Sequence, residues 1–412
     1  MCVNPWVRVP VGAEGEHRRT RADCRTVLVT VPTVAAGTRL LDLAQFLHDD
    51  HRVHVLFTIP DTIESWHGTT EFLHDHGGLV IPWAQAVQQH FDLVLAASYT
   101  GLERIRGQVL VIPHGASSLM SRRFSRSGGP GALPHAGLSR ETLTHRGRLI
   151  PSVVALTHDA ELAWLRESCP EAVPHAVVAG DICFDRLLAS RPLRDDYRRA
   201  LGLRAGERLV TVSSTWSTES AFGQHPQLYR RLLDALPPRH RLAAVLHPSI
   251  WAVYGRWQVR SWLSSCVRDG LLVIPPEEGW RAAIVASDLV VGDHGSVTQY
   301  ASALGKPVVL AAFPTHAVRP GSLADAVARV APVLDLDRSL PAQLRRAVNH
   351  SAEGDTTVAR MISSRPGGAG ETLRRAMYDL LRLSEPEHPA IAAPVPAPQP
   401  LWPDLHAQRR LS

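Results

Sequence analysis

Short apolar runs alternate with segments of helical periodicity along most of this chain. The first run, TVLVTVP at 26–32, leads into 37–48, where leucine and alanine recur at helical spacing. The same alternation continues with strand-like runs at 53–59, 79–82, 93–97, 108–113, 152–156 and 175–179. This order predicts a parallel sheet that is covered by helices on both faces.

A second series of the same kind follows a change in residue composition near residue 188. The segment 188–204 has helical periodicity and is rich in arginine and aspartate, and 205–207 predicts a turn. Strands are then expected at 208–213, 241–246, 271–275, 289–291 and 308–312, with helices that include 226–236 and 280–286. The chain therefore repeats the α/β theme.

The length of 412 residues and the hydrophobic content of 45% are enough for two ordinary cores. We predict an α/β protein with two Rossmann-like, doubly wound domains. The expected divisions are a flexible N-terminal arm (1–24), a first domain (25–187), an interdomain connection (188–207), a second domain (208–384) and a disordered Pro/Ala-rich tail (385–412). A helix with one apolar stripe is expected at 371–383, packed on a domain.

Charge and cysteine content narrow the class of protein. The net charge of +5 comes almost wholly from arginine, because Lys306 is the only lysine, and the arginines are scattered among acids. We therefore expect no nucleic-acid partner. Five cysteines without a CxxC pair fit a reduced, cytoplasmic protein. Because no apolar stretch approaches the roughly 20 residues of a membrane helix, membrane contact is expected to be at most peripheral, at the inner face.

Candidate chemistry lies where predicted strands end, and the richest such loop is GDHGS at 292–296. Gly295 lets a ligand approach the backbone, and Ser296 adds a hydroxyl beside the amides of a helix N-terminus, which suits a phosphate. The alternative is a βα turn in which Gly and Ser only shape the turn and cap the helix. Asp293 and His294 favour a functional loop, since capping needs neither.

Other strand ends carry residues of matching chemistry. In the second half these are His247 and a row of hydroxyl residues, Ser213, Ser214 and Thr215. If they converge with the 293–296 loop, they offer hydroxyls, an imidazole and helix amides to a diphosphate. In the first half, the strand at 108–113 runs into His114 and Gly115. An imidazole there can act as a base at neutral pH, although a solvated turn histidine is the alternative. No GxGxxG or GxxxxGK[ST] loop is present.

Five short segments occur in an order that resembles a known family. They are HG (114–115), GDICFDRL (180–187), VTVSSTWS (210–217), LHP (246–248) and DLVVGDHGSVTQYASALGKPVV (288–309). Over about residues 108–312 they resemble the CDP-glycerol glycerophosphotransferase family. Those enzymes have the GT-B fold and build teichoic-acid-type polymers. The resemblance implies two Rossmann-like domains that face each other across a cleft, the first on the acceptor side and the second binding the nucleotide donor.

The resemblance also implies roles for the strand-end residues. His114 would deprotonate the hydroxyl acceptor, lipid-linked acceptors included, for attack on the β-phosphorus of a CDP-linked donor. Asp293 would orient a neighbour or meet the acceptor. The donor diphosphate would be held by Thr215, His247, His294, Gly295 and Ser296, with Gly115, Ser213 and Ser214 elsewhere in the cleft. No cofactor and no metal are expected, because no acidic DxD pair follows a strand.

Three departures from the family pattern leave the donor and the activity open. Leu119 stands near the place of a lysine, with Arg122 and Arg123 slightly later, His294 replaces a tyrosine, and Tyr300 stands where an acid is common. DHGS with the later GKP also resembles UDP-N-acetylglucosamine 2-epimerases, although Thr298, Gln299 and Tyr300 follow where that pattern has two glutamates. A GT-B-like nucleotide-binding protein without turnover is the third alternative.

Overall fold

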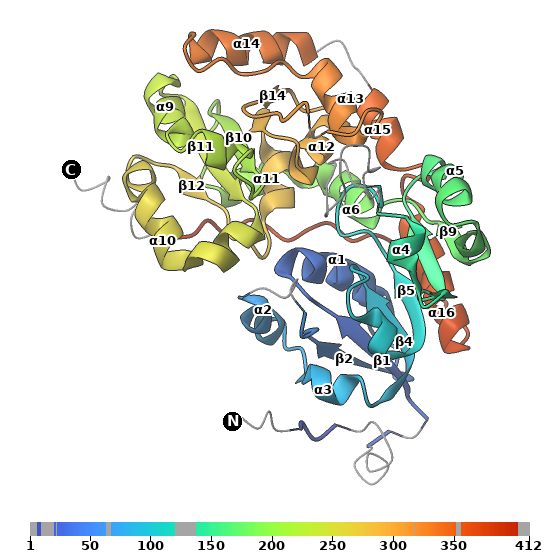
Figure 1. The fold of residues 1–412 in the computed structure, drawn as a ribbon. Coiled ribbons are helices and arrows are strands. Elements are labelled where there is room, and N and C mark those ends of the chain that lie inside the picture. The colour runs from blue at the N-terminus through green and yellow to red at the C-terminus, as the bar shows by residue number, and fades with distance from the viewer. Residues whose placement is uncertain are drawn as a thin grey trace. The chain divides into compact units, whose positions relative to one another are not determined.

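The computed structural model describes residues 6–9, 20–21, 23–62, 67–119, 137–316, 318–351 and 356–402. The chain divides into two compact units (Figure 1). Unit 1 consists of Met1–Ser118, Gly137–Cys183 and Ser364–Ala392, and unit 2 of Leu119–Ala136, Phe184–Ser363 and Ala393–Ser412.

Unit 1 is built on a seven-stranded sheet in the order β3-β2-β1-β4-β5-β8-β9, with every pair parallel. Its strands lie close to the predicted runs: β1 (Arg25–Thr30), β2 (Val53–Thr58), β3 (Val80–Ile81), β4 (His90–Ala96), β5 (Arg106–Val111), β8 (Val153–Leu156) and β9 (Ala176–Val178). A short antiparallel pair, which the apolar pattern did not predict, consists of β6 (Thr144–His145) and β7 (Arg148–Leu149). The helices of unit 1 are α1 (Val34–Ala44), α2 (Thr69–Asp75), α3 (Trp83–Ala86), α4 (Arg140–Leu143), α5 (Asp159–Ser168) and α16 (Ala369–Leu381).

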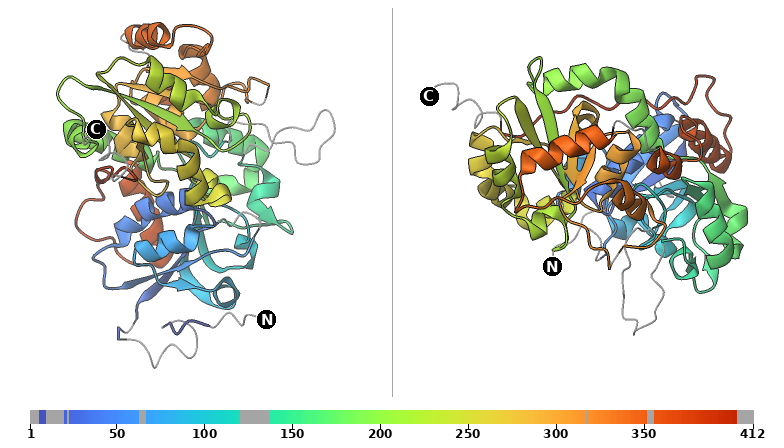
Figure 2. Two further views of the ribbon diagram at one scale, coloured as in Figure 1. Left: turned by 90° about the vertical axis from the view of Figure 1, so that its left-hand side faces the viewer. Right: turned by 90° about the horizontal axis from the view of Figure 1, so that it is seen from above.

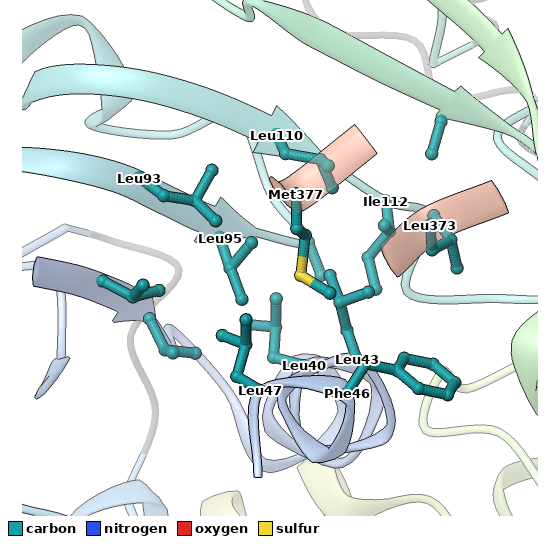
Figure 3. Packing of buried hydrophobic residues seen from close by; sticks show 14 of the residues in the cluster. Leu40, Leu43, Phe46, Leu47, Leu93, Leu95, Leu110, Ile112, Leu373 and Met377 are labelled. Carbon is teal, nitrogen blue, oxygen red and sulfur yellow. The ribbon is translucent and has the colours of Figure 1, made fainter. Parts of the chain in front are cut away.

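The core of unit 1 includes a helix from the far end of the sequence. Leu373 and Met377 of α16 are buried with Leu93 and Leu110 of the sheet (Figure 3). The hydroxyl of Tyr378 on the same helix donates to Asp50 at 2.8 Å. The helix thus lies close to its predicted bounds, but it belongs to unit 1, whereas we expected the second domain to extend to residue 384. Its apolar stripe alone could not show which sheet it covers.

Unit 2 has a five-stranded parallel sheet in the order β12-β11-β10-β13-β14. The strands are β10 (Arg208–Ser214), β11 (His240–Leu246), β12 (Leu272–Val273), β13 (Leu289–Gly292) and β14 (Val308–Leu310). Helices cover both of its faces (Figures 1 and 2). They are α7 (Arg194–Ala200), α8 (Ala221–Gln224), α9 (Leu228–Ala235), α10 (Pro248–Arg268), α11 (Trp280–Ala286), α12 (Ser296–Ala303), α13 (Leu323–Val330), α14 (Leu340–Ser351) and α15 (Thr357–Ile362).

The stretch expected to connect the domains contains the end of one helix and the whole of another. Helix α6 (Ile182–Ser190) and α7 flank a short 3-10 turn that contains Pro192, which cannot continue a helix. Arg198 of α7 donates to Asp288 at 2.9 Å and to the carbonyl oxygen of Ala286 at 3.0 Å. The segment predicted as a connection is therefore part of the packed body of unit 2.

The two ends of the chain also differ from expectation. Within the arm expected to be flexible, Val9 is buried and the amide of Val7 donates to Gln85 at 2.9 Å. In the tail, the carbonyl oxygen of Val395 accepts from Tyr197 at 2.6 Å, and the Leu401 amide donates to Val273 of β12 at 2.8 Å. Proline favours extended backbone but leaves carbonyl oxygens to accept from neighbours, so this composition suits docking as well as disorder. Most of the predicted arm (1–5, 10–19 and 22) and the end of the tail (403–412) lie outside the described residues.

Candidate functional site

The carboxyl ends of three neighbouring strands carry most of the predicted donor-site residues. Strand β10 lies between β11 and β13, and all three run in the same direction. Consequently Thr215, His247 and Asp293, which follow these strands, stand along one edge of the sheet. This is the edge where open parallel sheets bind ligands.

Asp293 fastens two of these loops together. Its Oδ2 accepts from the amide and hydroxyl of Thr215, at 2.8 and 2.9 Å, and from the amide of Ala221 at 3.0 Å. Its Oδ1 accepts from the amide of Gly295 at 3.0 Å, and the side chain is buried. Both oxygens are thus engaged with the protein. Of the two roles left open by the sequence, this geometry favours orienting neighbours over meeting the acceptor.

Two glycines are required here because neighbouring side chains fill the space beside them. A Cβ on Gly292 would lie 2.2 Å from Oγ1 of Thr298, and one on Gly295 would lie 2.5 Å from Cγ2 of Thr215. Real Cβ atoms do not approach so closely. In the structure the missing side chain of Gly295 makes room for Thr215, and the expectation that this glycine also admits a ligand to the backbone stays a prediction.

Helix α12 begins directly after this loop. Gly295 is its N-cap and provides no side chain to accept from the first-turn amides, and that turn holds no acidic residue. The positive end of the helix dipole therefore lies at Ser296. His294 is buried, and its carbonyl oxygen accepts from Gln299 at 2.9 Å. Tyr300 is buried against Trp280, with 5.8 Å between ring centroids, which makes it a core residue.

His247 occupies the turn between β11 and α10. Its Nδ1 accepts from the amide of Ser249 at 3.1 Å, so it caps the helix, and in the neutral ring the proton then resides on Nε2. An Nε2–H group is a donor suited to a phosphate oxygen. Ser213 is buried, and Oγ of Ser214 accepts from the amide of Phe222 at 2.9 Å. These two serines shape the β10 loop.

His114 follows β5 of unit 1 and has the opposite arrangement. Its side chain is exposed, and Nδ1 lies 3.0 Å from the carbonyl oxygen of Ala97. Because a carbonyl oxygen only accepts, Nδ1 carries the proton and Nε2 keeps the lone pair in the neutral ring. This tautomer can take a proton from a hydroxyl. Gly115 and Leu119 follow in the same loop, while Arg122 and Arg123 lie outside the described residues.

The sequence reasoning missed Glu161, a buried acid beside the His114 loop. One oxygen of Glu161 accepts from Oγ of Ser117 at 2.6 Å, from the amide of Ser118 at 2.7 Å and from Oγ1 of Thr157 at 3.0 Å, and the other accepts from the Thr157 amide at 2.7 Å. The available signal was a glutamate in the first turn of a helix that follows a strand.

Lys306, from the GKP segment, lies away from the strand-end loops. Its Nζ donates to the carbonyl oxygens of Val285 and Ser287, at 2.7 and 2.8 Å, where α11 ends. Burial lowers its pKa from 10.5 to about 8, and the positive charge of Arg194 acts in the same direction. This lysine therefore has a structural role.

Two further observations concern metals and membranes. Among the described residues, no three or more His, Cys, Asp or Glu side chains are grouped so that they could hold a metal ion. The expectation of a reaction without metal stays a prediction. Over the same residues, no helix combines the length and apolar character required to cross a bilayer.

Comparisons with known proteins reveal the fold. No family model and no curated protein matches the chain. The wall teichoic acid polymerase TagF matches with a TM-score of 0.52 at 11% identity, over 87% of this chain and 89% of that one. A putative UDP-N-acetylglucosamine 2-epimerase from Listeria monocytogenes matches with a TM-score of 0.50 at 13% identity, over 89% of this chain and 100% of that one. The chain thus has the GT-B fold of Rossmann-like α/β units.

Proposed function

We propose that this chain is a GT-B transferase that uses a nucleotide-diphosphate donor and a hydroxyl acceptor. The transferred group would be a glycerophosphate, from a CDP-glycerol-like donor, or a glycosyl group. The observation that carries the proposal is the pair of opposite imidazole tautomers. His247 presents an Nε2–H donor beside the Asp293 loops, whereas His114 presents an Nε2 lone pair.

Donor binding and deprotonation of the acceptor then depend on different residues. Donor phosphate oxygens accept from the N-terminal amides of α12, the hydroxyl of Ser296 and Nε2–H of His247. With a CDP-linked donor, the acceptor oxygen forms a bond to the β-phosphorus while the bond from that phosphorus to CMP breaks. His114 takes the acceptor proton and passes it to solvent. Donors at α12 stabilise the charge that develops on CMP.

Support also comes from a solved relative, because a TagF variant soaked with CDPG matches with a TM-score of 0.52 at 11% identity. The epimerase alternative lacks its two glutamates, and Thr298, Gln299 and Tyr300 at those positions are all buried in this chain. We therefore rank transfer above epimerisation and above binding without turnover.

The test is nucleotide release from CDP-glycerol, UDP-sugars and GDP-sugars with purified protein and a panel of hydroxyl acceptors. We expect one donor class to turn over and His114→Ala to lower kcat by about 100-fold or more. His175→Ala is the matched control, because Nδ1 of exposed His175 also lies 3.0 Å from a backbone carbonyl oxygen, that of Ser152. Full turnover in His114→Ala would refute the assignment of the base. Sugar inversion without an acceptor would favour the epimerase.

A further inference from the structure

Helix α10 lies in unit 2 (Figure 1). It exposes an unusual number of large apolar side chains. Ten large hydrophobic residues are exposed among the described residues, and four of them lie on this helix. They are Val253, Tyr254, Trp257 and Trp262, which are 55%, 53%, 78% and 45% exposed. We refer to these four residues as the aromatic face. Single apolar residues scattered over a surface are normal, whereas several on one helix indicate an interaction site.

The aromatic face is held in position by the fold. The opposite side of α10 is buried in the core of unit 2 through Val259, Leu263 and Val267. Gly255, with φ of 75° and ψ of 156°, interrupts the helix directly after Tyr254. The interruption lets the ring of Tyr254 meet that of Trp262 edge to face, with 4.9 Å between centroids. The rings of Tyr254 and Trp262 are thus held by contacts within the unit.

The charge of the helix complements an anionic partner. Residues 248–268 contain three arginines and no aspartate or glutamate. Arg260 lies with its guanidinium 5.9 Å from the ring centroid of Trp402, and Arg256 pairs with Glu277. Tryptophan and tyrosine beside arginine is the composition that favours the headgroup region of a bilayer, where the rings enter the interface and the cations meet lipid phosphates.

We infer that the aromatic face of α10 docks unit 2 on an anionic lipid bilayer. A second copy of this chain fits less well, because two such faces would bring the arginines of both copies together. The inference goes beyond the proposed reaction and needs no turnover.

The position of α10 links docking to the candidate site. The helix begins directly after His247, and Trp262 contacts Phe222, with 5.9 Å between ring centroids. The amide of Phe222 donates to Ser214, and that of Ala221 to Asp293. A docked bilayer would therefore lie on the element that carries His247. If the proposed transfer is correct, this placement favours an acceptor carried by the membrane.

The experiment is flotation of the full chain with vesicles of phosphatidylcholine alone or with phosphatidylglycerol added. We expect binding to the anionic vesicles only, weakened by salt. Arg260→Glu should lower the vesicle affinity by roughly tenfold or more, and Trp257→Ala should lower it several-fold. Trp6→Ala is the matched control, since Trp6 is 54% exposed in unit 1. Thermal unfolding of each variant verifies that it is folded.

Three results would overturn the inference. The first is an absence of flotation of the unaltered chain with anionic vesicles. The second is equal flotation with neutral vesicles, and the third is unchanged flotation of a folded Trp257→Ala, Arg260→Glu double variant. A concentration-dependent dimer that Trp257→Ala dissolves, in a chain that does not float, would assign the face to self-association. Failure of every donor to turn over would not affect these outcomes.

Discussion

Asp293 in unit 2 and Glu161 in unit 1 are two buried carboxylates with the same task. Each accepts four hydrogen bonds and thereby fastens loops that follow parallel strands. Their partners differ, because three of the four donors to Asp293 are backbone amides, whereas two of the four donors to Glu161 are hydroxyls. An amide can only donate, while a hydroxyl can rotate and accept instead. The Asp293 loops are consequently the less adaptable pair.

The difference matches the work proposed for each unit. A diphosphate site needs fixed donors. The Gly295 amide that Asp293 holds directly precedes α12, and the backbone amide of His247 donates at 3.0 Å to Ser214, the residue before Thr215. A base needs a correctly oriented ring, and that of His114 is oriented by the carbonyl oxygen of Ala97. Glu161 supports the loop that follows His114 rather than the ring itself. Replacing the carboxylate by an amide should therefore destabilise the protein more at Asp293 in unit 2 than at Glu161 in unit 1.

The largest effect is expected from Asp293→Asn. The asparagine NH₂ group would face amide donors that cannot turn into acceptors, so we expect a loss of roughly 2–4 kcal/mol in the free energy of unfolding. Binding of CDP or UDP, whichever the unaltered chain binds, should weaken at least tenfold. Urea unfolding and titration calorimetry measure the two effects.

Asp195→Asn is the control for this substitution, because the Asp195 side chain is 83% exposed on α7. Unchanged stability together with unchanged nucleotide affinity in Asp293→Asn would contradict the role assigned to Asp293.

Glu161→Gln should have a smaller effect. At either oxygen the new NH₂ group faces one amide donor, that of Ser118 or of Thr157. Beside the Ser118 amide, however, the hydroxyls of Ser117 and Thr157 can rotate to accept from it, so we expect a smaller loss of about 1–2 kcal/mol in the free energy of unfolding. Turnover on the active donor should fall while nucleotide affinity stays unchanged, because the loops proposed to bind the donor lie in unit 2. Glu103→Gln, at an exposed position of unit 1, is the control. A loss of nucleotide affinity as large as that of Asp293→Asn would break the comparison between the two units.

The same two carboxylates show which features of the fold and the site could be predicted from the sequence. The alternation of apolar runs predicted both parallel sheets, because fully buried strands are continuous apolar stretches. Asp293 was found because it directly follows a strand. Glu161 lies in the next helix and binds a loop more than 40 residues earlier, a relation that neither spacing nor periodicity reveals.

Pairings between distant segments account for most of the remaining differences. Helix α16 packs in unit 1 and Val395 is bound by Tyr197, yet the local pattern of each segment is satisfied equally well elsewhere. The histidine tautomers were also beyond the sequence, since each depends on whether Nδ1 meets an amide or a carbonyl oxygen. Both the long-range pairings and the histidine tautomers can be known only from the folded structure.

Lys306 offers the smallest perturbation, because its titration alters no contact of either carboxylate. Its hydrogen-bond partners are carbonyl oxygens, which are neutral, whereas each carboxylate is held by four donors. Its pKa should be about 8, below the ordinary 10.5. Because it is the only lysine, the ¹³Cε resonance of lysine-labelled protein reports this titration without assignment.

The lowered pKa fixes the direction of the pH dependence. Between pH about 8 and 10.5 the unfolded chain retains the proton on Lys306 and the folded chain has released it, so the unfolded state binds more protons. The free energy of unfolding therefore gains a contribution that rises with pH in this window and is constant below it. Lys306→Met should remove that contribution, so between pH 8 and pH 10 its free energy of unfolding, measured with urea, should rise less or fall more than that of the unaltered chain. A lysine resonance that titrates near 10.5 would show that the amine is solvated. Lys306 would then not be a buried charged group like the two carboxylates.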